Sequence, residues 1–184
     1  MFIISVSGST GAGKDTAANY IAKKMHLTHI SGGDVVRDML HTLKLAPSRY
    51  VVRDFSIFLR KHFTDGFIIQ RVIDQNTNPH GVVTSGLRTP TEADEVLKRG
   101  GIIIYIEANL NTRYQRIHER ARTGDVTEMH QLKTLDAKER GSNQDEDENL
   151  GLVKRKANHI VINEGSLEEF YRQLDVICEE ITKA

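Results

Sequence analysis

The sequence predicts a three-layer α/β fold, in which a central parallel sheet of about five strands lies between helices. Short apolar runs rich in β-branched residues alternate with segments of helical periodicity along the chain. The runs are apolar on both faces, which is typical of strands in a buried parallel sheet. A glycine-rich turn at residues 8–13 joins the first run to the first periodic segment. Alternation of this kind favours βαβ units with helices on both sheet faces.

The strands and helices follow in order from these patterns. Four apolar runs predict strands at 2–6, 82–84, 102–106 and 159–162. Apolar residues recur at helical spacing in 14–25, 35–43, 47–63 and 67–73, and further helices are expected between 84 and 102, at 110–122 and from 166 onward. The stretch 123–149 is polar and holds an acidic run near its end, so we expect a mobile, solvated excursion there.

Length and composition restrict the class of protein. A chain of 184 residues, 39% apolar and 27% charged, fits one globular domain, residues 1–184. Lysine plus arginine and aspartate plus glutamate both number 25, and this balance does not suit a nucleic-acid or anionic-membrane binder. The single cysteine, Cys178, excludes an internal disulfide and favours a reducing compartment. Without a long apolar segment or a signal-peptide pattern, we expect a cytoplasmic protein.

Residues 8–16, with the sequence Gly-Ser-Thr-Gly-Ala-Gly-Lys-Asp-Thr, form the clearest motif of the chain. They follow a buried strand and open a helix, so backbone N–H groups and the positive helix end can face an anion. Lys14 supplies a mobile cation for outer phosphates. The predicted triphosphate site consists of Gly8, Thr10, Gly11, Ala12, Gly13, Lys14, Asp15 and Thr16.

One position in this loop departs from the usual pattern. The residue after the lysine is usually Ser or Thr, whose hydroxyl contacts Mg²⁺, and here it is Asp15. The loop resembles that of adenylate-kinase-like nucleoside monophosphate kinases, which often read Gly-Lys-Gly-Thr. The chain also resembles small dephospho-CoA-kinase-like proteins over nearly its whole length. The resemblance implies a P-loop kinase fold with ATP as donor, Mg²⁺ as cofactor and Thr16 as a candidate metal contact. It also implies an acceptor-binding insertion near 34–75 and a lid near 120–155.

The segment 31–37, Ser-Gly-Gly-Asp-Val-Val-Arg, is similar to the acceptor segment of these kinases. The resemblance assigns Asp34 to a Mg²⁺-bound water and to catalysis, and Arg37 to the acceptor phosphate. Asp34 lies at a predicted helix start, so helix capping is the alternative explanation.

The segment 86–90, Gly-Leu-Arg-Thr-Pro, follows the second predicted strand and resembles the motif whose arginine clamps the acceptor phosphate. Arg88 suits this role because a guanidinium can grip a phosphate with two donors. Glu92 matches a position that recognises the acceptor, but it also completes a capping box with Thr89, which we favour. Ser85 stands where relatives place Asp or Glu, so Asp34 or, second, Asp15 must supply the metal carboxylate.

The predicted lid begins with arginines on one helical face. Arg113, Arg116 and Arg120 recur three and four residues apart. By resemblance, Arg116 and Arg120 bridge donor and acceptor phosphates, with Arg113, Arg122 and Arg140 as weaker candidates. Asn163 and Gly165, after the last strand, are expected to border the donor base.

The resemblance therefore implies Mg²⁺-dependent transfer of the ATP γ-phosphoryl group to a nucleoside monophosphate. The implied catalytic residues are Lys14, Asp34, Arg88, Arg116 and Arg120. Dephospho-CoA is an alternative acceptor. A catalytically weak nucleotide-binding regulatory protein is a third possibility, because Asp15 and Ser85 both depart from the usual pattern. We expect small-molecule partners, no nucleic acid or membrane, no zinc, and a monomer or homodimer.

Overall fold

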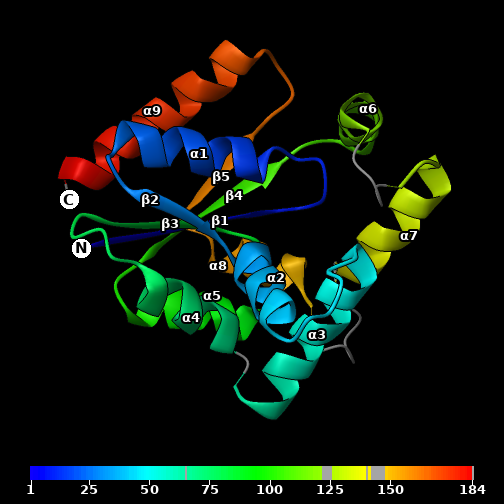
Figure 1. The fold of residues 1–184 in the computed structure, drawn as a ribbon. Coiled ribbons are helices and arrows are strands. Elements are labelled where there is room, and N and C mark those ends of the chain that lie inside the picture. Colours follow the sequence, from blue (N-terminus) through cyan, green and yellow to red (C-terminus); the bar gives the residue numbers. More distant parts are fainter. Residues whose placement is uncertain (65, 122–125, 140, 142–147, 184) are drawn as a thin grey trace.

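The computed structural model describes residues 1–64, 66–121, 126–139, 141 and 148–183. These residues form one five-stranded sheet with the strand order β2-β3-β1-β4-β5, in which all paired neighbours are parallel. The strands are β1 (Phe2–Gly8), β2 (Thr28–Ser31), β3 (Gly81–Ser85), β4 (Ile102–Glu107) and β5 (His159–Ile162). The prediction of a parallel α/β sheet is confirmed, and Figure 1 shows helices on both of its faces. The sequence patterns missed β2, a four-residue edge strand.

The described helices agree with the predicted alternation and add two elements. They are α1 (Lys14–Lys24), α2 (Gly32–Thr42), α3 (Arg49–His62), α4 (Phe67–Gln75), α5 (Pro90–Lys98), α6 (Leu110–Arg120), α7 (Met129–Glu139), α8 (Leu150–Lys156) and α9 (Leu167–Lys183). Helix α8 was not predicted. Helix α7 lies inside the stretch 123–149 that was expected to be a polar excursion, so at least this part is regular structure. The acidic residues 145–147 lie outside the described part.

The core divides between the two faces of the sheet because successive side chains of each strand point in opposite directions. On one face, Ile4 and Val6 of β1 pack with apolar residues of α1 and α9. On the other, Ile3 of β1 packs with residues of α2, α4, α5 and α8. The sheet is therefore buried on both sides, as the continuous apolar runs predicted. None of the described helices has the length and apolar character needed to cross a membrane.

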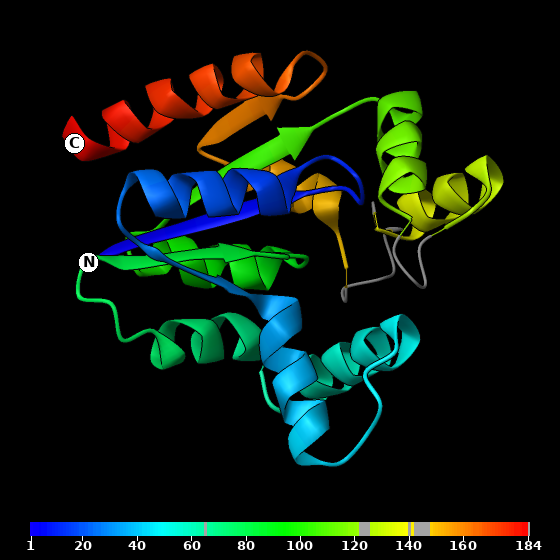
Figure 2. The same cartoon turned by 45° about the horizontal axis from the view of Figure 1, so that its top comes forward.

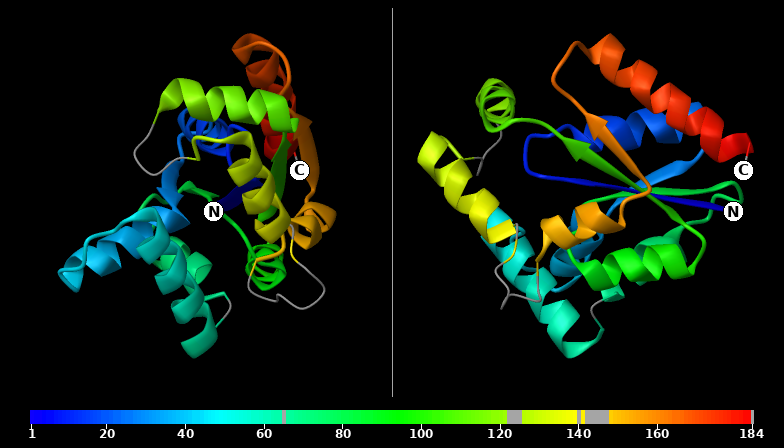
Figure 3. Two further views of the ribbon diagram at one scale, coloured as in Figure 1. Left: turned by 90° about the vertical axis from the view of Figure 1, so that its right-hand side faces the viewer. Right: turned by 180° about the vertical axis from the view of Figure 1, so that it is seen from behind.

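Two helical units lie at the same end of the sheet, beyond the carboxyl ends of its strands (Figures 2 and 3). One contains α2 and α3, which share with α4 a separate apolar cluster of Val36, Leu40, Leu59 and Ile68. It falls within the expected insertion at 34–75. The other contains α6 and α7. In a parallel sheet, the carboxyl ends of all strands meet at one edge, and ligands bind there in open α/β folds.

Arg113 fastens the second unit to the rest of the molecule. Its guanidinium forms a bidentate ion pair with Asp136 of α7 and donates a hydrogen bond to the Thr10 carbonyl oxygen at 3.1 Å. Its Nε donates to the Ala108 carbonyl oxygen at 3.0 Å. Arg113 is buried. The structure therefore assigns Arg113 to the support of α7 and the glycine-rich loop, and not to an exposed face that would meet phosphates.

Candidate active site

The loop between β1 and α1 has the backbone shape that its glycines predict. Gly8 and Gly13, at its two ends, have φ of 147° and 101°, which side-chain-bearing residues rarely adopt. A Cβ atom on Gly13 would lie 2.5 Å from Nδ2 of Asn163, and one on Gly8 would overlap the Ile106 carbonyl oxygen. Gly11 and Ala12 lie between these two positions. The loop therefore passes close against the Ile106 backbone and the Asn163 side chain before it opens into α1.

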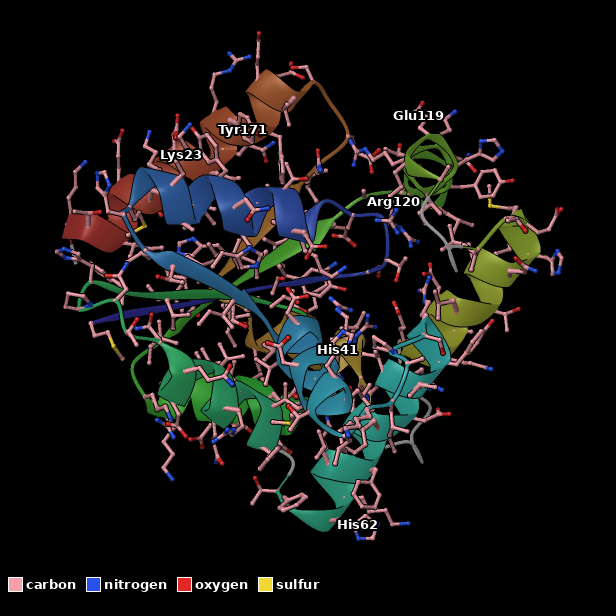
Figure 4. All side chains as sticks on the ribbon, in the orientation of Figure 1. Lys23, His41, His62, Glu119, Arg120 and Tyr171 are labelled. Carbon is pink, nitrogen blue, oxygen red and sulfur yellow. The ribbon has the colours of Figure 1, made fainter. Side chains whose placement is uncertain are left out.

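A cavity of about 400 Å³ extends from this loop to the unit of α2 and α3. Among the described residues, its lining includes the basic side chains of Lys14, Arg37, Arg49, Arg53, Arg60, Arg88 and Arg120. Figure 4 labels Arg120 at the end of α6, on the side of the glycine-rich loop. This concentration of cations in a chain of zero formal charge makes the cavity suitable for an anionic ligand.

Lys14 lies at the start of α1 and lines the cavity. Burial lowers the pKa of its ammonium group, and the neighbouring cations Arg88 and Arg120 act in the same direction. The carboxylates of Asp15 and Glu139 oppose this effect. An ammonium group whose charge is disfavoured by burial and by two guanidinium groups is stabilised by an added anion such as a phosphate.

Arg88 follows β3 and faces a carboxylate that the sequence patterns missed. Its Nη1 lies 2.5 Å from Oε1 of Glu139, the last residue of α7. The Thr10 hydroxyl of the glycine-rich loop donates to the same oxygen at 3.1 Å. The second oxygen, Oε2, is buried, and it has no hydrogen-bond partner among the residues that the structure describes. A protein carboxylate thus lies between the phosphate loop and the arginine expected to bind the acceptor.

The charges in this contact shift both pKa values. Burial would raise the pKa of Glu139, but Arg88, Lys14 and the Thr10 hydrogen bond outweigh it, so the pKa is lowered. Burial would lower the pKa of Arg88, but Glu139 and Glu148 outweigh it, so the pKa is raised. Both groups are therefore charged at neutral pH.

Glu92 lies behind the arginines of the cavity. Its Oε2 accepts hydrogen bonds from the backbone N–H groups of Arg88 at 2.9 Å and Thr89 at 3.3 Å, which completes the capping box of α5. Its Oε1 accepts from Nε of Arg60 at 3.0 Å. Glu92 is buried and is absent from the described cavity lining. The structure confirms the cap and places Glu92 as a support of Arg60 and Arg88, which corrects its assignment to direct acceptor contact.

The two residues expected to meet the metal are placed away from the cavity. Asp34 is paired with Arg37 on the surface of α2, with 2.5 Å between Oδ1 and Nη2, and only Arg37 of this pair lines the cavity. The cap of α2 is Ser31, which accepts from the Gly33 N–H, so Asp34 is not the cap either. Thr16 is exposed and also outside the lining.

Asp15 and Ser85, the two departures from the usual motif, lie in contact in the cavity wall. The Ser85 hydroxyl donates to Oδ1 of Asp15 at 2.9 Å. On the other side, Ser85 Oγ lies 3.0 Å from Nε2 of His29, whose Nδ1 lies 2.7 Å from Oδ1 of Asn19. Burial lowers the pKa of His29 more than Asp15 and Asp34 raise it.

The loop after β5 is hydrogen-bonded to the glycine-rich loop. Asn163 donates from Nδ2 to the Ala12 carbonyl oxygen at 2.8 Å. Arg116 donates to the carbonyl oxygen of Asn163 at 3.1 Å and to its Oδ1 at 3.2 Å. Gly165 borders a second, more open hollow with Glu164 and Arg172. Arg116 thus supports the loop expected to border the donor base, whereas Arg120 reaches the cavity. Arg122 and Arg140 lie outside the described residues.

The sequence patterns used above did not predict three arginines of the cavity, although their spacing in the sequence indicates a shared helix face. Arg49, Arg53, Ser56 and Arg60 recur at helical spacing and line the cavity from one face of α3. The apolar stripe of the same helix dominated the sequence pattern. A polar stripe rich in arginine inside an expected acceptor-binding insertion was the available sign.

Known proteins resemble this chain in sequence and in fold. Residues 7–136 match the family model described as an AAA domain. A UPF0200 protein of Staphylothermus marinus is 31% identical over 175 residues, which span 94% of this chain and 88% of that protein. A UPF0200 protein of Methanocaldococcus jannaschii is 31% identical over 188 aligned residues, covering 98% and 91% of the two chains. The chain belongs to the UPF0200 family.

Solved structures share the fold of this UPF0200 chain at low sequence identity. Shikimate kinase from Acinetobacter baumannii, in complex with shikimate, superposes with a TM-score of 0.61 at 14% identity and covers 100% of this chain and 94% of its own. A gluconokinase from Sinorhizobium meliloti gives a TM-score of 0.56 at 16% identity and covers 98% and 95%. The UPF0200 chain therefore has a P-loop kinase fold.

Proposed function

We propose that this UPF0200 chain is a kinase that transfers the γ-phosphoryl group of ATP to a nucleoside monophosphate. The observation that carries the proposal is the cavity itself, in which Lys14 of the phosphate loop and the arginines 37, 88 and 120 line one space of about 400 Å³. These are four of the residues that the sequence assigned to donor phosphate, acceptor phosphate and lid. A donor and an acceptor that both carry phosphate need this density of positive charge.

In the proposed reaction, the phosphate-loop amides and Lys14 bind the β- and γ-phosphates of ATP. Arg88 and Arg37 orient the acceptor phosphate. An oxygen of that phosphate forms the new bond to the γ-phosphorus while the bond to the β,γ-bridging oxygen breaks. Arg120 offsets charge on the transferring group. Positioning and charge neutralisation supply the catalysis, without a covalent intermediate.

Mg²⁺ is the cofactor we propose for this reaction, and when bound it would neutralise charge on the donor phosphates. The cavity wall offers an oxygen ligand of the kind that Mg²⁺ prefers in the carboxylate of Asp15, which accepts a hydrogen bond from the Ser85 hydroxyl. The donor set therefore fits a magnesium ion that also contacts phosphate.

Dephospho-CoA is the second candidate acceptor, favoured by the arginines on α3. Arg49 and Arg53 line the cavity beyond Arg37 and Arg88. The pyrophosphate of dephospho-CoA would supply anionic partners for them, whereas a nucleoside monophosphate has one phosphate. In that reaction the acceptor atom is a sugar hydroxyl oxygen.

A coupled assay of ADP formation tests the proposal. The panel contains nucleoside and deoxynucleoside monophosphates and dephospho-CoA, with shikimate and gluconate as the acceptors suggested by the names of the structural neighbours. We expect turnover with at least one monophosphate and none in Lys14→Ala. ATP binding without turnover on any acceptor would contradict the kinase proposal and favour a regulatory nucleotide-binding protein. Turnover with dephospho-CoA alone would favour the second candidate.

A further inference from the structure

Two unusual residues in the sequence form a contact in the fold. Asp15 opens the first turn of α1, and Ser85 is the last residue of β3. They are 70 positions apart, yet the Ser85 hydroxyl donates to Oδ1 of Asp15 at 2.9 Å. Both side chains line the cavity with Lys14. The two residues that depart from the usual motif therefore lie next to each other in the cavity wall.

In other P-loop proteins, the hydroxyl and the carboxylate occupy the opposite positions. In P-loop proteins, a Ser or Thr follows the lysine and its hydroxyl contacts Mg²⁺, while an acidic residue from a neighbouring strand supplies a carboxylate. In this chain the carboxylate follows the lysine and the hydroxyl ends the strand. Each departure alone would remove one oxygen group, but together they retain a carboxylate and a hydroxyl.

The hydroxyl is held from the opposite side. Ser85 is buried, and its Oγ also lies 3.0 Å from Nε2 of His29, on the neighbouring strand β2. Nδ1 of His29 lies 2.7 Å from Oδ1 of Asn19 on α1. Because the single hydroxyl proton is donated to Asp15, Ser85 Oγ accepts from His29 in the tautomer that carries the proton on Nε2, and Ser85 is then held from both α1 and β2. A carboxylate held in this way is oriented before any ligand arrives.

The other acidic side chains in or beside the cavity pair with arginines. Among the described residues, Glu139 and Glu148 are the other carboxylates of the lining. Glu139 is bound to Arg88 at 2.5 Å, and Glu148 lies 3.7 Å from Arg53. Asp34 is turned to the surface with Arg37. Asp15 is the carboxylate adjacent in sequence to the phosphate-binding lysine.

We propose that Asp15 supplies the charged oxygen ligand for the Mg²⁺ that accompanies ATP, and that Ser85 is the positioning residue that orients the Asp15 carboxylate. The hydroxyl and the carboxylate have thereby exchanged positions between the phosphate loop and β3. This inference rests on the proposed ATP-dependent function.

The exchange predicts that removal of the Asp15 carboxylate has opposite effects on binding without and with a divalent metal. Without a divalent metal, the Asp15 carboxylate repels the ATP phosphates, so its removal should strengthen ATP binding. With metal present, the same carboxylate would help to hold the ion that accompanies the phosphates, so its removal should weaken metal binding. A residue that only supports the fold would weaken both.

The experiment measures both affinities on the full chain. ATP affinity is titrated calorimetrically in EDTA, and Mn²⁺ affinity in the presence of ATP is measured by electron paramagnetic resonance of the free ion. We expect Asp15→Asn to raise ATP affinity in EDTA by about threefold or more. We expect Asp15→Asn and Ser85→Ala to weaken Mn²⁺ binding by about ten- to a hundredfold. Asp34→Asn is the matched control and should change neither affinity.

The reciprocal exchange provides the decisive variant. Asp15→Ser should weaken Mn²⁺ binding, and the double variant Asp15→Ser with Ser85→Asp should recover most of it, because the usual arrangement is then restored. The inference is overturned if Mn²⁺ affinity is unchanged in folded Asp15→Asn, or if a folded double variant shows no recovery. In either case, ATP binding by the wild type would still support the proposed function. Failure of the wild type to bind ATP in either condition overturns both.

Discussion

Oε1 of Glu139 lies 2.5 Å from Nη1 of Arg88 and 3.1 Å from Oγ1 of Thr10. Helix α7 therefore brings a negative charge against the loop that is proposed to bind phosphates. In the proposed reaction, phosphate oxygens of ATP and of the acceptor would need the same donors. Binding of either ligand must displace this carboxylate or work against its charge.

The first prediction follows from this competition. Glu139→Gln keeps the size of the side chain but removes the charge that repels phosphate, so ATP affinity should rise about threefold or more. Isothermal titration of ATP measures the change. Glu119→Gln is the control, because it makes the same replacement of a carboxylate by a carboxamide at an exposed position of α6 (Figure 4). It should leave the ATP affinity unchanged. Weaker ATP binding by Glu139→Gln would show that the carboxylate assists the nucleotide instead of competing with it.

The second prediction concerns the pH dependence of stability. The pKa of Glu139 is lowered from its ordinary value of 4.5, so the ionised form stabilises the folded state. This contribution is complete above pH 4.5 and is lost as the pH falls through the lowered pKa of the folded protein. The difference in Tm between the wild type and Glu139→Gln should therefore be largest near neutral pH and shrink below about pH 4. Thermal melts across this range measure it, and a difference that grows on acidification would contradict the sign.

The part of the site that local sequence patterns predicted is the part built from neighbouring residues. The loop of residues 8–16, with Lys14, depends on glycines and a helix start that lie next to each other in the chain. Arg37 and Arg88 were found because each lies in a short segment that resembles a motif of the kinase family. All of these residues meet at the carboxyl edge of the sheet, as a parallel fold requires.

The missed part depends on contacts between distant residues. The face of α7 buries Leu132, Asp136 and Glu139, two of which are charged. Burial of these carboxylates is possible because Arg113 and Arg88, 23 and 51 positions away, pair with them. No local periodicity could reveal such partners, so the segment looked like a solvated loop. Strand β2 was missed for a simpler reason, since Ile30 is the only large apolar residue among its four.

The structure does not support the assignment of Asp34 to the metal, for a related reason. Asp34 looked suitable from its place at a helix start, but its side chain turns to the surface and pairs with Arg37. The contact between Asp15 and Ser85 joins α1 to β3 and depends on the parallel pairing of β1 with β3. Each residue alone appeared to be a loss, and only the fold shows that they are neighbours.

The third prediction concerns the support of α7. Arg113 and Asp136 form a buried ion pair, with 3% and 9% of their side chains exposed. Arg113→Met leaves the Asp136 carboxylate buried without its partner, so the free energy of unfolding should fall by about 3–5 kcal/mol. Urea denaturation measures this loss, and Arg155→Met at an exposed position of α8 is the control.

A second variant separates the charge from the packing in this pair. Arg113→Met with Asp136→Leu removes both charges, so most of the lost stability should return. The Thr10 carbonyl oxygen loses its hydrogen bond in both variants, so ATP affinity should stay reduced in both. If the double variant is less stable than the single one, the buried charge of Asp136 is not the cause of the loss.

The last prediction separates the donor half of the cavity from the acceptor half. Arg88→Ala removes the guanidinium assigned to the acceptor phosphate, so the acceptor KM should rise and kcat should fall, for a combined loss in kcat/KM of about a hundredfold or more. ATP affinity should fall far less than acceptor affinity, because the guanidinium is assigned to the acceptor and the change acts on ATP only through the charge of Glu139, which loses its ion pair beside the phosphate loop. Arg99→Ala, whose side chain pairs with Glu95 on the surface of α5, is the matched control and should leave both ligands unaffected. Steady-state kinetics with the acceptor identified on the panel give the first quantity, and ATP titration gives the second. An equal loss in ATP affinity and in acceptor KM would mean that Arg88 serves the donor as well, and the division of the cavity between two phosphate-bearing ligands would then have to be redrawn.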